Sequence, residues 1–357
     1  MAVPFILAPM AELSHRALRE LIEDFGGCDE YFTEMISAGA LAGGGRFESF
    51  YTDTAPCPER VVFQLLGYDP DQIARAAVLL DRFPSAGIDI NMGCSAPAIT
   101  RLGGGVRWMA SVDRAGALIR LVRPKIRRRL SVKLRIGMED NFDYLLEFCR
   151  RLEAEGVERI TLHPRTAREK FRRSARWEYV GRLRDSLSIP VAGNGDIADA
   201  EELFRRAASG ACDAVMAGRA AVRAPWIFAE TRAMEGRRTA GSGLYPMRNS
   251  IPTGRYTAYP PEDTGSAGEG RERRGAAAGT KPGEWVKVDI EGTGLRFLEL
   301  LARHQPPEFH LSRARRFFSY FCDNLTWAHY LKTKLNREET LQGIERVWRD
   351  YWKKGEK

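Results

Sequence analysis

Short runs of apolar residues alternate with amphipathic stretches along residues 1–235 of the chain. The apolar runs are too short for typical helices and are rich in Ile, Val and Leu, so they predict buried β-strands. The stretches between them are long enough for crossover helices, and this rhythm favours parallel strands. The eight predicted strands are Phe5–Met10, Glu30–Met35, Val61–Leu66, Ile88–Gly93, Leu130–Ile136, Arg159–His163, Ile189–Gly193 and Ala214–Gly218.

Several of the intervening stretches carry signals for where a helix begins or ends. Ser14 and Asp69 can accept hydrogen bonds from the free N–H groups of a first helical turn, and Pro70 suits the first helical position. Glycines follow three of the stretches, where a left-handed residue can end a helix. The predicted helices with such signals are Ser14–Phe25, Pro70–Arg82, Phe142–Ala154 and Asp199–Ala208.

Eight strands alternating with eight helices in this length predict an α/β fold, a TIM (β/α)8 barrel with a small C-terminal helical domain. A doubly wound open sheet is the alternative. It favours a glycine-rich turn after the first strand, and the segment Ala8-Pro9-Met10-Ala11 does not provide one. We therefore predict a barrel over residues 1–235.

The composition changes after the barrel segment. Residues 236–293 are rich in Gly, Arg and Pro with few aliphatic residues, which predicts a flexible linker or insertion. Helical periodicity returns in residues 294–357, which predict a helical domain. That domain carries cations among aromatic residues, a pattern typical either of phosphate binding or of a solvated basic face. The cations are Arg313, Arg315, Arg316, Lys332, Lys334 and Arg337.

Charge and cysteine usage narrow the class of protein. The 357 residues have a formal net charge of +8 and a pI near 9.2, which suits a polyanionic partner. The six cysteines are scattered without disulfide or metal-ligand spacing, so we expect a reducing cytoplasm and no metal. No apolar run approaches the roughly 20 residues of a membrane span, and the first residues lack the pattern of a signal peptide. We expect a cytoplasmic protein.

Candidate chemistry gathers where the predicted strands end. Residues Gly87–Cys94 form a short strand followed by Gly93, which would allow a sharp turn that presents the thiol of Cys94. Each polar residue at a strand end would by itself be an ordinary rim residue, but in a barrel the set converges on one pocket. Backbone N–H groups of the Gly193–Asp196 and Ala217–Arg219 segments could bind a phosphate there. The set comprises Gln64, Asn91, Cys94, Lys133, Arg135, His163, Arg165, Asn194, Asp196, Gly218 and Arg219.

These residues resemble the tRNA-dihydrouridine synthases, flavin enzymes that reduce particular uridines in tRNA. The similarity lies in the spaced combination, because no single string is specific. The matching segments are Ala8-Pro9-Met10, the strand with Gln64, Asn91-Met92-Gly93-Cys94, Lys133-Leu134-Arg135-Ile136-Gly137, His163-Pro164-Arg165-Thr166, Gly193-Asn194-Gly195-Asp196 and Gly218-Arg219. The C-terminal helical domain also resembles the second domain of the family.

The resemblance implies a mechanism and a set of site residues. NADPH, or NADH, would reduce FMN, which would pass hydride across the uracil C5–C6 double bond while Cys94 gives the proton. The target uridine would leave its stack, and the enzyme is expected to act as a monomer on tRNA. The implied substrate contacts are Asn91, Arg135 and Arg165. The implied FMN contacts are Pro9, Met10, Gln64, Lys133, His163, Asn194, Gly195, Asp196, Gly218 and Arg219.

Two loops depart from the family pattern. The family usually has Pro after the cysteine and a Lys shortly afterwards, whereas this chain has Ser95 and then a triple glycine at 103–105. Phe171-Arg172-Arg173 stands where the family has an aromatic–Lys–Gly segment. Two alternative functions therefore remain open: an FMN barrel that reduces a small pyrimidine-like substrate, or a tRNA-binding family member with impaired catalysis.

Overall fold

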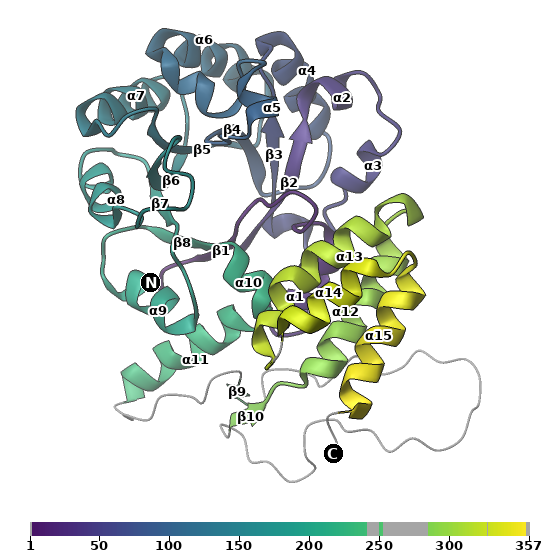
Figure 1. Cartoon of the computed structure of the whole chain (residues 1–357). Helices are drawn as coiled ribbons and strands as arrows, with labels where there is room; N and C mark the ends of the chain where they lie inside the picture. Colours follow the sequence, from purple (N-terminus) through teal and green to yellow (C-terminus); the bar gives the residue numbers. More distant parts are fainter. Residues whose placement is uncertain (1, 241–249, 253–284, 327, 355–357) are drawn as a thin grey trace. The chain divides into compact units, whose positions relative to one another are not determined.

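The computed structural model describes residues 2–240, 250–252, 285–326 and 328–354. Eight parallel strands close into a barrel, so the predicted TIM barrel is confirmed (Figure 1). Each predicted strand is present, with ends shifted by up to a few residues. The strands are β1 (Phe5–Leu7), β2 (Glu30–Ser37), β3 (Val61–Leu66), β4 (Gly87–Met92), β5 (Arg129–Gly137), β6 (Arg159–Thr166), β7 (Val191–Asn194) and β8 (Ala214–Ala217).

The first strand closes the ring. Ile6 of β1 pairs with Glu30 of β2 on one side and with Met216 of β8 on the other. Every neighbouring pair in the barrel is parallel, so all eight carboxyl ends meet at the same mouth.

The helices of the barrel follow the predicted signals. Asp69 accepts a hydrogen bond from the Gln72 amide at 2.9 Å, and Asp199 caps its helix in the same way. The glycines after α7 and α9 adopt left-handed φ angles of 97° at Gly156 and 69° at Gly210. The helices are α2 (Ala38–Ala42), α3 (Glu48–Tyr51), α4 (Pro70–Leu80), α5 (Pro97–Thr100), α6 (Val112–Val122), α7 (Phe142–Ala154), α8 (Trp177–Arg184) and α9 (Ala200–Ala208), with 3-10 turns η1 (Pro58–Arg60), η2 (Gly105–Ala110) and η3 (Arg123–Lys125).

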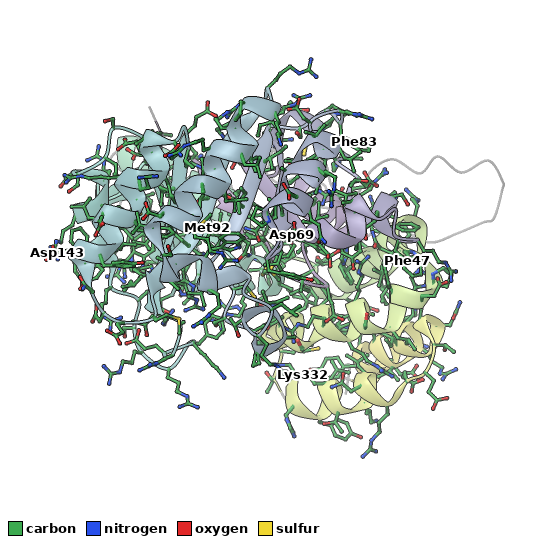
Figure 2. All side chains as sticks on the ribbon, turned by 90° about the horizontal axis from the view of Figure 1, so that it is seen from above. Phe47, Asp69, Phe83, Met92, Asp143 and Lys332 are labelled. Atoms are coloured by element: carbon green, nitrogen blue, oxygen red, sulfur yellow. The ribbon has the colours of Figure 1, made fainter. Side chains whose placement is uncertain are left out.

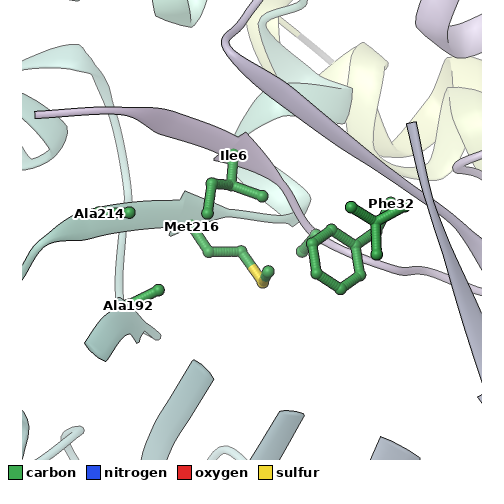
Figure 3. Close-up of a cluster of buried hydrophobic side chains, with 7 residues drawn as sticks. Ile6, Phe32, Ala192, Ala214 and Met216 are labelled. Carbon is green, nitrogen blue, oxygen red and sulfur yellow. The ribbon is translucent and has the colours of Figure 1, made fainter. Parts of the chain in front are cut away.

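The barrel interior has an apolar side and a polar side. The apolar side comes from β1, β2, β3, β7 and β8, and it forms the cluster of Ile6, Ala8, Phe32, Val62, Ala192, Ala214 and Met216 (Figure 3). Residues two apart on a strand share a face, and lateral neighbours in the sheet do too. The polar side therefore comes from alternate residues of β3 to β6, and it contains the buried Gln64, Asp89, Asn91, Ser131 and Thr161.

The outer face of the strands is buried as well, and β4 is buried along its whole length. Met92, which follows Asn91 on β4, is fully buried, whereas Asp143 in the first turn of α7 is exposed (Figure 2). The protein thus buries apolar side chains on the outer face of the strands, beneath the helices.

The chain divides into two compact units. The first comprises residues 1–16 and 29–219, and the second comprises residues 17–28 and 220–357. The second unit contains α1 (Arg16–Glu23) from Ala17 onward, and this helix lies within the predicted helix Ser14–Phe25. Arg296 of α12 (Ile290–His304) connects α1 to this unit, because it lies 3.8 Å from Glu20 of α1 and bonds Asp24, just after α1, at 2.9 Å.

The second unit is largely helical. Phe297 stacks on Phe317 with a ring separation of 3.7 Å, and Phe318 packs against Trp348 at 4.8 Å. Its other elements are α10 (Arg219–Arg223), α11 (Ile227–Ala240), α12 (Ile290–His304), α13 (Pro307–Phe321), η4 (Cys322–Asn324), α14 (Ala328–Arg337) and α15 (Leu341–Lys354).

Part of the predicted linker at 236–293 lies outside the described residues. The described parts are regular: α11 continues to Ala240, β9 (Ser250–Pro252) pairs with β10 (Trp285–Lys287), and α12 begins at Ile290. Composition did not indicate these elements. Within the described part of the chain, none of the helices has the length and apolar character that a membrane span requires.

Candidate active site

The strand ends bring the predicted polar residues together at the mouth of the barrel. Lys133 and Arg135 lie on β5, His163 lies on β6 beside Arg135 in the sheet register, and Asn194 ends β7. On the opposite side of the ring, a Cβ placed on Gly218 would lie 3.5 Å from the Met10 sulfur. The chain after β1 and the chain after β8 therefore form one wall of the mouth.

Cys94 is held by a turn centred on Asn91. The Asn91 side-chain oxygen accepts hydrogen bonds from the amides of Gly93 at 3.1 Å and Cys94 at 2.8 Å. The Cys94 carbonyl accepts a bond from the Val106 amide at 2.9 Å. The thiol is half-buried, whereas the other five cysteines are buried. Cys94 therefore lies just after the end of β4, in a half-buried position.

Gly93 has a different role from the one that its sequence position suggested. It does not adopt a left-handed φ, so the turn does not depend on glycine's backbone freedom. A Cβ at this position would lie 3.2 Å from the carbonyl carbon of Leu134 on β5. Close approach to the neighbouring strand, rather than a sharp turn, is the reason for glycine here.

The triple-glycine loop supports the backbone of Cys94. Gly105 has a φ of +57°, and a Cβ there would overlap the Cys94 carbonyl oxygen. A Cβ on Gly104 would lie 2.8 Å from the Gly67 carbonyl, which also accepts the Trp108 indole N–H at 2.9 Å. The loop that departs from the family pattern is thus packed closely against the candidate acid.

Sequence reasoning missed a buried polar chain below the mouth. Gln64 donates from Nε2 to Asp89 at 2.8 Å and accepts from Asn91 Nδ2 at 2.8 Å, while Ser131 donates to Asp89 at 2.7 Å. Asp89 and Gln64 are fully buried. The signal was present in the sequence, because Asp89 alternates with isoleucines and shares the face of Asn91.

The mouth is strongly cationic. Burial, followed by the neighbouring Arg135, lowers the pKa of Lys133 to about 8. Burial, followed by Arg165, lowers the pKa of Arg135 to about 10. Burial pushes the pKa of His163 far below its usual range. Four surrounding cations lower the pKa of His163 further, and Lys133 has the largest effect among them. His163 is therefore a neutral imidazole in a positive field.

Arg135 ties three segments of backbone together. Its guanidinium donates to the Gly93 carbonyl at 3.2 Å, the Thr166 carbonyl at 3.3 Å and the Lys170 carbonyl at 3.2 Å. The sequence suggested a contact with substrate for this arginine. In the structure its donors join the Cys94 loop to the loop that follows β6.

Arg165 makes a similar connection on the next strand. It is only 3% exposed, pairs with Asp196, donates to the Arg173 carbonyl and lies 3.0 Å from His163 Nε2. The other Asp196 oxygen accepts the Ala175 amide at 2.7 Å. Arg165 therefore holds the loops after β6 and β7 together.

The glycines after β7 make room for aromatic rings. A Cβ on Gly193 would overlap the Trp177 indole, whose N–H donates to the Gly195 carbonyl at 3.0 Å. Gly195 has a φ of +118° and faces His163, to which a Cβ would approach within 2.9 Å. Asn194 donates to the Met216 carbonyl at 2.8 Å, which joins β7 to β8.

Phe171 lies among the cations of the mouth. It is 57% exposed, and its ring lies 4.4 Å from the Arg219 guanidinium and 6.0 Å from the His163 ring. Its ring is also 5.7 Å from the Arg135 guanidinium. An exposed aromatic face is thereby placed beside the candidate site.

A pocket of about 490 Å³ adjoins this loop. Arg176 in the pocket is neutralised, because it bonds both Glu169 and Asp140. The exposed guanidinium groups of Arg168 and Arg172 have no ion-pair partner among the described residues. The pocket is lined by Met138, Glu139, Asp140, Thr166, Arg168, Glu169, Arg172, Arg173 and Arg176.

Curated relatives match about two thirds of the chain. The chain is 33% identical over 231 residues to a probable tRNA-dihydrouridine synthase of Aquifex aeolicus, covering 63% of this chain and 71% of the relative. It is 30% identical over 239 residues to the tRNA-dihydrouridine(16) synthase of Ralstonia nicotianae, covering 64% and 72%. A probable tRNA-dihydrouridine synthase of Mycobacterium tuberculosis is 33% identical over 247 residues, covering 65% and 63%.

The family model for dihydrouridine synthase (Dus) matches residues 6–242. This range includes the barrel from Ile6 of β1 to the end of β8, with all the strand-end residues described above. The chain belongs to the dihydrouridine synthase family.

Proposed function

We propose that this protein reduces the C5–C6 double bond of uridine in tRNA, with FMN as cofactor and NADPH as electron source. The observation that carries the proposal is the half-buried thiol of Cys94, held by Asn91 at a cationic barrel mouth. The family match and the names of the relatives support the reaction and the tRNA substrate.

The residues of the mouth suit a flavin phosphate. Asn194, Gly195, Asp196, Gly218 and the exposed Arg219 form the β7 and β8 ends, where backbone N–H groups and a guanidinium can bind an anion. Gly218 leaves ordinary contact space beside Met10, where a larger residue would intrude. The phosphate of FMN would lie on Asn194, Gly195, Gly218 and Arg219, while the Asp196 carboxylate pairs with Arg165 and could offer only its backbone N–H.

The remaining contacts would come from the polar and apolar sides of the mouth. Pro9 and Met10 would pack against the flavin ring, and Lys133 and His163 would face its polar edge. Gln64 is fully buried, so it would support that edge through its hydrogen bond with Asn91. When bound and reduced by NADPH, FMN supplies hydride chemistry.

The thiol of Cys94 supplies the proton in this proposal. Cys94 Sγ would give a proton to uracil C5 when C6 receives hydride, and the sulfur would then regain a proton from solvent. Lys133 and Arg135 both lie close enough to Cys94 to interact with its charge, so they would stabilise the thiolate between the two steps. Asn91 would keep the thiol facing the bound uracil.

Recognition of tRNA is assigned to exposed cations on each unit. Arg168, Arg172 and Arg173 line the pocket beside the mouth and would contact phosphates near the extruded uridine. On the helical unit, Arg316 and Arg337 are exposed, whereas Arg313 is buried against Phe309. A substrate bearing several phosphates fits these groups better than a free pyrimidine does.

Reconstitution tests this function. The purified protein is expected to bind FMN with a yellow spectrum, to oxidise NADPH, and to form dihydrouridine in tRNA that lacks the modification, measured by mass spectrometry. Product from free pyrimidines but not tRNA would favour the small-substrate alternative. Colourless protein that refuses FMN would favour the binding-only alternative.

Cys94→Ala is the matched test of the acid. It is expected to keep FMN binding and flavin reduction by NADPH while losing at least about 100-fold in dihydrouridine formation, the usual scale for a general acid. Cys149→Ala, at a buried position in α7, is the control and is expected to keep activity. Unimpaired product formation by Cys94→Ala would remove Cys94 from this role.

A further inference from the structure

The hydrogen-bond chain below the mouth joins a buried carboxylate to the Cys94 backbone. It runs from Asp89 through Gln64 to Asn91, and from Asn91 to the Cys94 amide, with donor–acceptor distances of 2.8 Å at each step. We propose that Asp89 is a positioning residue that fixes the orientation of both amides and thereby the place of Cys94. The expected effect of Asp89 on uridine reduction rests on the proposed function, whereas the hydrogen bonds from Asp89 to Cys94 do not depend on it.

The direction of each bond follows from the carboxylate. An ionised Asp89 can only accept, so Gln64 must turn its NH2 group toward it. The Gln64 carbonyl then faces Asn91 and accepts from its NH2 group. This leaves the Asn91 carbonyl oxygen facing the amides of Gly93 and Cys94. A flip of either amide would place two acceptors or two donors against each other.

Burial makes this ordering strict. Asp89 and Gln64 are 0% exposed and Asn91 is 6% exposed, so solvent cannot replace a lost partner at low cost. Ser131 on β5 donates to the second Asp89 oxygen at 2.7 Å and prevents the carboxylate from rotating. Asp89 lies one layer below Asn91 and is separated from Cys94 by two side chains, so it acts on Cys94 through those side chains.

Two substitutions of Asp89 separate positioning from charge. Asp89→Asn keeps an oxygen for Gln64 and a donor for Ser131, whose hydroxyl can accept instead. Asp89→Leu removes both bonds and frees Gln64 to flip. We expect Asp89→Leu to lower kcat for dihydrouridine formation about fivefold or more with little change in the KM for tRNA, and Asp89→Asn to stay within about twofold.

Thr161→Val is the matched control. Thr161 lies on the polar side of the barrel on β6, is fully buried, and its hydroxyl makes no hydrogen bond with any of the described residues. Removing that hydroxyl deletes an interior polar group but leaves the hydrogen bonds between Asp89, Gln64, Asn91 and Cys94 unchanged. We expect Thr161→Val to have the same kcat as the wild type and a similar thermal stability.

Alkylation of Cys94 tests the chain without relying on enzyme activity. Iodoacetamide will alkylate Cys94 selectively in the folded holoenzyme, because the other five cysteines are buried. We expect Asp89→Leu to alkylate about fivefold faster, since the released turn exposes the thiol, and Asp89→Asn to alkylate at the wild-type rate. Ser131→Ala, which removes one support of the carboxylate, should give a smaller change of about twofold.

The outcomes divide cleanly. If the variants alkylate at the expected rates relative to wild type but the wild-type protein forms no dihydrouridine, the proposed function is overturned and the positioning role stands. Wild-type alkylation rates and kcat in both Asp89→Leu and Ser131→Ala would overturn the positioning role. Equal losses in Asp89→Leu and Asp89→Asn would also overturn it, because they would assign the effect to charge rather than to bond direction.

Discussion

Two ionisable residues in the barrel interior, Asp89 and Lys133, have pKa values that the surrounding protein moves toward 7. Burial raises the pKa of Asp89 to about 6, although hydrogen bonds from Ser131 and Gln64 oppose the shift. Burial lowers the pKa of Lys133 to about 8. Both groups are charged at pH 7, and each favours the charged form of the other. The charges on the polar side of the barrel interior therefore depend on Asp89 and Lys133 together.

Asp89 predicts a specific pH dependence of stability. Its pKa is 3.8 in an unperturbed chain and about 6 in the folded protein, so between these values the folded state binds more protons. Its contribution to the free energy of unfolding therefore falls as pH rises from about 4 to about 6. Asp89→Asn removes this term, and we expect Asp89→Asn to gain stability relative to wild type over that range. Urea unfolding at pH 4, 5, 6 and 7 measures the difference.

Gly105 predicts a steric effect on the candidate acid. Gly105→Ala places a Cβ against the Cys94 carbonyl and strains a residue with a φ of +57°. We expect a loss of about 2–3 kcal/mol in the free energy of unfolding and a marked loss of dihydrouridine formation. Gly210→Ala is the control, because Gly210 has a φ of +69° but nothing within 4 Å of its added Cβ. It should cost about 1 kcal/mol and leave activity intact, as thermal melts and turnover assays will show.

At the scale of elements, the candidate site depends on loops that are fastened to one another. Arg135 joins the end of β4 to the loop after β6, and Arg165 joins that loop to the turn after β7. The barrel supplies parallel strand ends, but it does not by itself order the loops that follow them. The two arginines order these loops from below.

Arg165→Met tests this fastening. It breaks a pair in which the arginine side chain is 4% exposed and the Asp196 side chain is 33% exposed. We expect a loss of about 2 kcal/mol, below the range for fully buried pairs because Asp196 reaches solvent. FMN affinity, measured by fluorescence titration, should fall with it. Arg184→Met, which breaks a more exposed pair with Asp213, should change both quantities little.

At the scale of the whole molecule, only some of the cationic side chains that make the protein basic are available to bind a polyanion. Of the six cations named in residues 313–337, Arg313 is buried and Arg315 donates to the Glu338 carbonyl. Lys332, labelled in Figure 2, pairs with Asp323. Arg316 and Arg337 are exposed. The helical unit thus uses some of its cations for its own stability.

This division predicts different results for neighbouring arginines. Arg316→Ala and Arg337→Ala should weaken tRNA binding more at low than at high salt and reduce the salt slope by roughly one for each phosphate that is no longer bound. Filter binding across a salt series measures both. Arg205→Ala, at an exposed position on α9, is the charge-matched control and should leave the slope unchanged. Arg313→Ala should mainly lower stability, because its guanidinium packs on the Phe309 ring at 4.4 Å. Equal losses of affinity at all salt concentrations would contradict phosphate binding by Arg316 and Arg337.

Much of the fold and the residues of the site followed from local patterns. The alternation of apolar runs and capped helices predicted all eight strands and the helices α4, α7 and α9, because caps and periodicity act within a few residues. The rule that strand ends meet at one mouth then placed Lys133, His163, Asn194 and Cys94 in one region. These predictions needed no knowledge of distant contacts.

Only the tertiary structure decided how those residues are used. The glycine at position 93 follows from the close approach of β5, and the hydrogen bonds of Asp89 with Gln64 and Ser131 form only when β3, β4 and β5 are side by side. Arg135 and Arg165, which local sequence could only place at strand ends, bind backbone carbonyls of loops up to 42 residues away. The sequence by itself determined the barrel and the identity of its polar rim, since both arise from short-range periodicity. The partners of each rim residue depend on close packing between segments far apart in the chain, which no local pattern encodes.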